Sequence, residues 1–76
     1  MTNFKKIRET MTEQALSIEF VMRGHVRVEL RQLADACQLN ETTVEFILAQ
    51  MESVSMVQRV AFGRYALTPE YLRAQM

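Results

Sequence analysis

The chain has only two glycines and one proline in 76 residues, so few positions force a helix or strand to end. Gly24 follows Arg23, and a glycine behind a basic last turn is a common helix end. Gly63 lies between two strand-like runs, where positive φ closes a hairpin. Thr68 and Pro69 have the order of a helix N-cap followed by proline at the first helical position. These residues divide the chain into a helical part, a hairpin and a short closing helix.

Before Gly24, the apolar spacing predicts helix. Apolar residues recur there at intervals of three and four, which places one stripe along a helical face: Phe4, Ile7, Met11, Ala15, Ile18 and Met22. A capping box from Thr10 to Glu13 favours a break in the helix near residues 10 to 12.

The middle of the chain has the pattern of a short strand followed by two helices. Alternating β-branched and polar residues over 25–28 predict a very short strand. Apolar spacing predicts one helix over about 29–37 and another over about 41–52, with Asn40 as the N-cap of the second. The hairpin strands and the closing helix are expected over about 56–60, 64–67 and 69–74.

This order of elements, with LRQLADACQLNETTVEFIL at the turn between two helices, resembles the winged helix-turn-helix superfamily of small bacterial-type DNA-binding regulators. Leu33 and Ala34 take the family's apolar-alanine pair, and MVQRVAFGRYALT resembles its wing. The core positions of the DNA-reading helix fall on Val44, Ile47 and Leu48. The resemblance covers about residues 18–68 and implies a mainly α fold with a small β-hairpin, the wing, at 56–67. The length of the chain fits one domain over 1–76, with residues 1–12 as an N-terminal extension and possible dimerisation segment.

Two turns depart from the family pattern. Gln38 and Ser55 stand where the family usually has glycine, and a left-handed conformation there costs about 1 kcal/mol. The fold can absorb this cost, although both turns are open to alteration.

The resemblance implies a transcriptional regulator in which the helix predicted over about 41–52, called the third helix below, faces DNA. The exposed positions on this side are Asn40, Glu41, Thr42, Thr43, Glu45, Phe46 and Ala49. Threonine hydroxyls can bond to base edges, and an aromatic ring can contact a thymine methyl group. No basic residue lies between Arg31 and Arg59, so phosphate contacts must come from elsewhere. The expected DNA-binding residues are Arg27, Arg31, Thr42, Thr43, Phe46, Arg59 and Arg64.

Positive charge is available around this motif and at the N-terminus. It is carried by Lys5, Lys6, Arg8, Arg23, Arg27, Arg31, Arg59 and Arg64. One interpretation is that the wing and the start of the helix predicted over about 29–37 bind phosphates from two sides. The other is that these basic side chains are ordinary solvated surface.

A competing hypothesis uses the acidic face of the third helix. Glu41, Glu45 and Phe46 would then hold a basic protein partner, which would relieve the like charges one turn apart. A third hypothesis, an accessory protein that inhibits another factor, rests only on the small size of the chain.

An enzyme, a metal site and a cofactor are not expected. Cys37 is the only cysteine and falls on an apolar helix face, where core packing is its expected role. His25 has no ligand cluster around it and is expected to be structural or to contact a phosphate. No phosphate loop or nucleophile motif is present.

Net charge, hydropathy and the N-terminal stripe bear on location and partners. The net charge is zero, so no overall field attracts the chain to DNA or to a membrane. No apolar run has the length of a membrane span or a signal peptide, which favours a cytoplasmic location. The stripe of Phe4, Ile7 and Met11 favours a homodimer; the alternative is that it folds back beside Tyr71 and Leu72.

Overall fold

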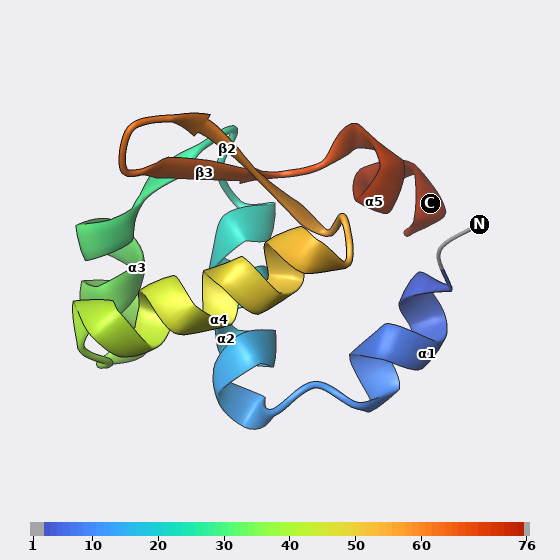
Figure 1. Cartoon of the computed structure of the whole chain (residues 1–76), viewed down its shortest axis with the longest axis horizontal. Coiled ribbons are helices and arrows are strands. Elements are labelled where there is room, and N and C mark those ends of the chain that lie inside the picture. The colour runs from blue at the N-terminus through green and yellow to red at the C-terminus, as the bar shows by residue number, and fades with distance from the viewer. Residues whose placement is uncertain (1–2, 76) are drawn as a thin grey trace.

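The computed structural model describes residues 3–75. Five helices and three strands follow one another along the chain (Figure 1): α1 (Phe4–Glu9), α2 (Glu13–Arg23), β1 (Val28–Glu29), α3 (Leu30–Cys37), α4 (Glu41–Ser53), β2 (Val57–Ala61), β3 (Arg64–Leu67) and α5 (Pro69–Ala74). The strands form one antiparallel sheet in the order β1-β3-β2. The prediction of a mainly helical fold with a small hairpin is confirmed.

Side-chain caps explain most helix starts. The backbone N–H of Thr43 donates to Asn40 Oδ1 at 2.7 Å at the start of α4, as the sequence predicts. The break near residues 10 to 12 is also confirmed, but the cap of α2 is Thr12 and not Thr10. Thr10 instead closes α1 by donating its hydroxyl to the carbonyl of Ile7 at 2.8 Å.

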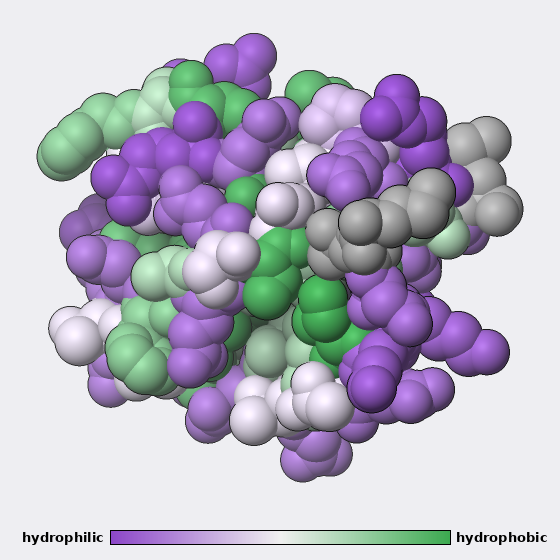
Figure 2. Space-filling view, turned by 45° about the vertical axis from the view of Figure 1, so that its right-hand side comes forward, coloured by the Kyte–Doolittle hydropathy of each residue, from purple (hydrophilic) through white to green (hydrophobic). Residues whose placement is uncertain are grey.

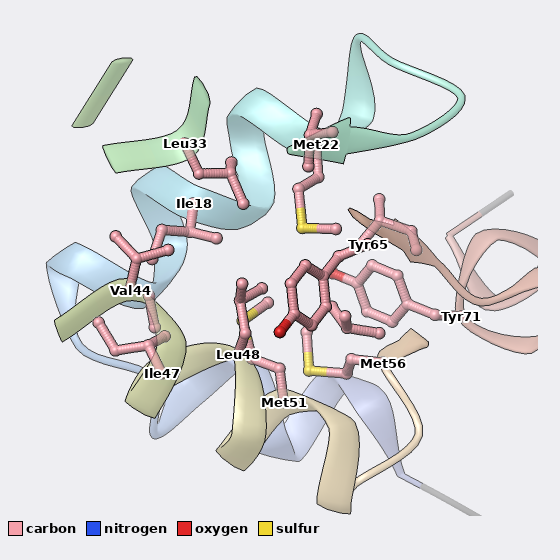
Figure 3. Packing of buried hydrophobic residues seen from close by; sticks show 14 of the residues in the cluster. Ile18, Met22, Leu33, Val44, Ile47, Leu48, Met51, Met56, Tyr65 and Tyr71 are labelled. Atoms are coloured by element: carbon pink, nitrogen blue, oxygen red, sulfur yellow. The ribbon is translucent and has the colours of Figure 1, made fainter. Parts of the chain in front are cut away.

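The core lies between the helices and one face of the sheet (Figure 3). Helices α2 to α5 and the segment before β2 contribute side chains that are almost completely buried: Ile18 and Met22 from α2, Leu33 from α3, Val44 and Leu48 from α4, Met56 before β2, and Tyr71 from α5. The apolar positions predicted for the helices over about 29–37 and 41–52, which are α3 and α4, therefore face one another.

Both turns with unusual residues keep their left-handed geometry. Gln38 has φ 57° and Ser55 has φ 66°. The following residue at each turn donates its N–H back into the helix, from Leu39 to the carbonyl of Ala34 at 3.0 Å and from Met56 to that of Met51 at 3.0 Å. This closure satisfies carbonyls at the helix ends and offsets the strain of a non-glycine residue.

The predicted strand over 25–28 is wrong in its bounds, because only Val28–Glu29 pairs with β3. His25 is instead held against the end of α2, with its Nδ1 3.0 Å from the carbonyl oxygen of Val21. The structural role expected for His25 fits this contact.

The N-terminal segment folds back on the domain. Phe4 is 4% exposed and meets the ring of Tyr71 edge-on, with ring centroids 5.1 Å apart. Ile7 and Met11 pack against the core from the same stripe, whereas Leu72 stays exposed. The structure therefore shows the fold-back alternative at Tyr71, and the stripe no longer argues for a dimer.

Candidate functional site

The start of α3 is joined to the turn of the hairpin. The N–H of Leu30 donates to the carbonyl of Gly63 at 3.0 Å, and Glu29 is the register partner of Arg64 across β1 and β3. Glu29 also forms a capping box with Gln32, which fixes the first turn of α3. The hairpin and α3 are therefore held together locally as one surface.

Three exposed arginines belong to this surface, and we call them the basic junction: Arg27, which directly precedes β1, Arg31 in the first turn of α3, and Arg64 at the start of β3. Within residues 3–75, the one ion pair that these arginines form is between Arg64 and Glu29, at 3.7 Å, with 49% of the arginine side chain and 61% of the glutamate side chain exposed. Exposed pairs of this kind stabilise by about 1 kcal/mol or less. Arg64 can therefore exchange its carboxylate for another anion.

Arg59 lies on the other face of the wing. It is the register partner of Tyr65 and shares a face with that buried residue, so it points to the helix side of the sheet, while Arg64 points away. Its guanidinium donates to the Tyr65 hydroxyl at 3.1 Å and lies 5.3 Å from the ring centroid. The two wing arginines, which the sequence placed in one phosphate clamp, are thus on opposite faces.

The remaining predicted residues lie on α4. Thr42 and Phe46 are exposed, and Thr43 is half-buried. Glu41 and Glu45 are exposed as well, and neither forms an ion pair with any residue in 3–75. The outer face of α4 is therefore acidic and has no basic side chain.

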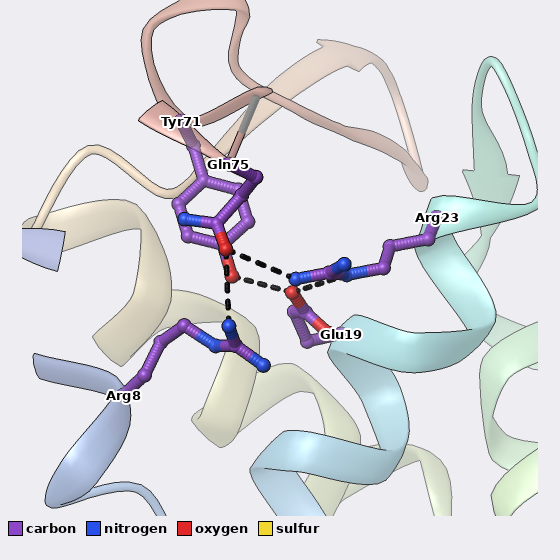
Figure 4. A network of polar contacts seen from close by, with 5 residues as sticks. All are labelled: Arg8, Glu19, Arg23, Tyr71 and Gln75. Carbon is purple, nitrogen blue, oxygen red and sulfur yellow. Dashed lines mark hydrogen bonds and ion pairs between the residues drawn. The ribbon is translucent and has the colours of Figure 1, made fainter. Parts of the chain in front are cut away.

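A buried polar network joins α1, α2 and α5 (Figure 4), and sequence reasoning missed it. Glu19 is 2% exposed and accepts hydrogen bonds from the Tyr71 hydroxyl and, at 2.7 Å, from Arg23 Nε. Gln75 Oε1 accepts from Arg8 at 3.0 Å and from Arg23 at 3.2 Å. Two cations expected to be free at the surface, Arg8 and Arg23, are therefore engaged by groups of the domain itself, although 40% of the Arg23 side chain stays exposed.

One sequence signal could have indicated this network. Glu19 is four residues after Ala15 and three before Met22, so it lies on the apolar stripe of α2. A carboxylate on such a stripe needs partners, and Arg23 is one turn further on the same face.

Tyr71 gives a testable pH dependence. Burial, followed by the hydrogen bond to Glu19, raises the pKa of the Tyr71 hydroxyl above its ordinary value. This group therefore contributes stability that is complete below the unfolded pKa of about 10 and is lost as pH rises through the folded pKa. Urea denaturation between about pH 8 and pH 11 should show the alkaline loss in the wild type and a smaller one in Tyr71→Phe. An equal loss in both proteins would contradict this role.

Three other features bear on function. Burial raises the pKa of the half-buried Cys37 thiol, which disfavours the reactive thiolate at neutral pH. Figure 2 shows hydrophobic surface in a hollow of the face that it presents. A groove of about 330 Å³ is lined by Ile7, Met11, Val54 and neighbouring residues. Of the helices in residues 3–75, none combines the length and the hydrophobicity that crossing a bilayer requires.

No family model and no curated protein matches the chain. Among solved structures, the fold is similar to ligand-free NadR, with a TM-score of 0.76 and 20% identity over 87% of this chain and 49% of that one. An IclR-family protein from Rhodococcus sp., named as a transcriptional regulator, has a TM-score of 0.70 and 28% identity over 88% of this chain and 26% of its own. An IclR regulator from a Silicibacter species has a TM-score of 0.69 and 22% identity over 80% of this chain and 24% of its own.

These likenesses confirm the winged-helix fold. Proteins named as transcriptional regulators share it with this chain, at low identity. The chain spans about half of the NadR chain and about a quarter of the two IclR chains.

Proposed function

We propose that this protein is a DNA-binding transcriptional regulator that contacts phosphates mainly through the basic junction of Arg27, Arg31 and Arg64. The observation that carries the proposal is the joining of these three exposed arginines on one surface of a winged-helix domain, by the Leu30–Gly63 hydrogen bond and the β1–β3 ladder. The similarity to transcriptional regulators supports the choice of DNA as the anion.

The acidic α4 limits how DNA can be bound. Phosphates repel carboxylates, so Glu41 and Glu45 disfavour a deep position of α4 in the major groove. Thr42, Thr43 and Phe46 are left for few base contacts. We therefore expect affinity to depend chiefly on phosphate neutralisation, with modest discrimination between sequences.

Titration of the protein against random-sequence duplex DNA, at several salt concentrations, tests this function. Each neutralised phosphate contributes about −0.9 to the slope of log affinity against log salt, so the three arginines of the basic junction give roughly −2.7. No binding at the lowest salt, or binding independent of salt, would refute the proposal.

A second function, binding of a basic protein partner through the outer face of α4, is favoured by one specific observation. Glu41 and Glu45 have no basic partner in residues 3–75, and Phe46 beside them is 64% exposed. A basic protein segment would complement this face. The test measures binding of an arginine-rich peptide by the wild type and by the variant with Glu41→Gln and Glu45→Gln. If the wild type binds the peptide but not DNA, and the variant loses the peptide, the protein-interaction function replaces the DNA-binding one.

A homodimer and a cytoplasmic location remain predictions that accompany the regulator. Symmetric pairs of winged-helix domains match two half-sites on DNA. Because Phe4 is buried and Ile7 and Met11 pack against the core, a dimer would form through a surface other than this stripe. Sedimentation over a range of protein concentrations should show the dimer, and a monomer throughout would exclude it.

A further inference from the structure

Phe62 is at the tip of the wing and is 99% exposed. It forms, with Gly63, the two-residue turn between β2 and β3, and we call these two residues the wing tip. Figure 1 shows this turn at the end of the molecule opposite α1 and α5. An isolated aromatic ring of this exposure contributes little to the core, so packing does not explain it.

The wing tip is held in a defined position. Gly63 has φ 70°, and a Cβ there would meet no atom within 4 Å, so the backbone conformation and not space requires glycine. Ala61 and Arg64 pair on either side of the turn, and Gly63 accepts the hydrogen bond from Leu30. A backbone held in this way loses little conformational freedom when the wing tip binds.

The register of the pairing between β2 and β3 also shifts immediately before the wing tip. Arg59 pairs with Tyr65 and Ala61 pairs with Arg64, so Val60 is an extra residue in β2. Such an irregularity increases the local twist of the hairpin and re-aims the side chains that follow it.

The surroundings of the ring are basic. Residues 56–67 contain two arginines and no carboxylate. Arg59 and Arg64 point to opposite faces of the hairpin, so each face of the strands next to the tip carries one cation. An apolar tip next to a basic surface complements a polyanion that has apolar material between its charges, and duplex DNA has stacked bases between two phosphate backbones.

We propose that Phe62 is a wedge that inserts between base pairs of duplex DNA from the minor groove, while Arg64 of the basic junction approaches a phosphate beside it. The proposal rests on the DNA-binding function above and adds its structural mode. Apolar side chains that enter the minor groove partially unstack a base step and kink the duplex. The wing would thus favour flexible pyrimidine–purine steps, which deform most easily.

The test combines affinity with unwinding of DNA, because unwinding does not require a known operator. Wild type, Phe62→Ala and Phe62→Leu are titrated against random duplex DNA. Each is then added to closed circular plasmid, which is relaxed with a topoisomerase and freed of protein. Phe20→Ala, which removes another ring of 75% exposure from α2, is the matched control.

We expect Phe62→Ala to weaken binding by about 10-fold with an unchanged salt slope, since one base–aromatic contact is lost and no charge. At equal occupancy of the plasmid, wild type should leave it negatively supercoiled after protein removal, and Phe62→Ala should not. Phe62→Leu should keep most of the unwinding, and Phe20→Ala should keep all of it. Every variant should unfold at the same urea midpoint as the wild type.

The outcomes distinguish a failure of the wedge proposal from a failure of the proposed DNA-binding function. If wild type does not bind the duplex, the DNA-binding function and the wedge both fall. If wild type binds and Phe62→Ala unwinds plasmid equally, only the wedge is refuted. If Phe62→Ala loses binding to phosphatidylserine vesicles and not to DNA, the wing tip is a membrane contact and the wedge is refuted.

Discussion

Replacing Arg27, Arg31 and Arg64 together by alanine is expected to weaken binding to random duplex DNA by on the order of 100-fold, at about 1 kcal/mol for each lost phosphate contact. The salt slope should flatten by roughly 2.7 units, because three phosphates are no longer neutralised. Fluorescence anisotropy of a labelled duplex measures both quantities. The three side chains are exposed, so the variant should fold normally apart from the small loss of the Arg64–Glu29 pair.

A charge-matched control is available at the far end of the molecule. Lys5→Ala, Lys6→Ala and Arg73→Ala remove the same three charges from exposed positions on α1 and α5, and Figure 1 shows these helices at the end opposite the wing turn. This variant should lose less than about threefold in affinity through the weaker overall field. Equal losses in both variants would show that net charge, and not the basic junction, determines binding.

Replacing Glu19 by alanine is expected to lower the free energy of unfolding by about 3 kcal/mol. The change leaves the Tyr71 hydroxyl buried without its acceptor and removes the charge partner of Arg23. Domains of this size are stable by only about 5 kcal/mol or somewhat more, so the loss is a large fraction of the total. Urea denaturation followed by circular dichroism gives the value.

Two further variants define the origin of that loss. Glu45→Ala removes an exposed glutamate from the interior of α4 and should change stability by less than about 0.5 kcal/mol. Glu19→Leu with Tyr71→Phe removes both polar partners and should recover much of the loss, since apolar replacement of a buried pair is often nearly neutral. A Glu19→Ala variant as stable as the wild type would contradict the burial of this carboxylate.

Local signals in the sequence predicted most of the fold. Asn40 and Thr68 cap helices because their side chains accept the free backbone N–H groups of the first turn. The apolar spacing placed Leu33, Val44 and Leu48 in the core, and Gly63 in a turn of positive φ. These features depend on residues a few positions apart, which a sequence displays directly.

Features that depend on distant residues were missed, misplaced or left as one of two alternatives. The packing of Phe4 on Tyr71 was the alternative to a dimer, and the bond between Glu19 and Tyr71 was missed; both join residues more than fifty positions apart. Arg59 and Arg64 were expected to act together, but the irregular pairing between β2 and β3 sets their faces. The full exposure of Phe62 also follows from the hairpin geometry, because an aromatic ring in a strand-like run is more often buried.

The surface that meets DNA can be identified directly by following backbone amide chemical shifts while an unlabelled random duplex is added to the isotope-labelled protein. The basic junction predicts the largest changes at residues 27–31 and 62–64, with smaller changes along the outer face of α4. Changes confined to α4 around Glu41, Glu45 and Phe46, or no changes at low salt, would contradict the account.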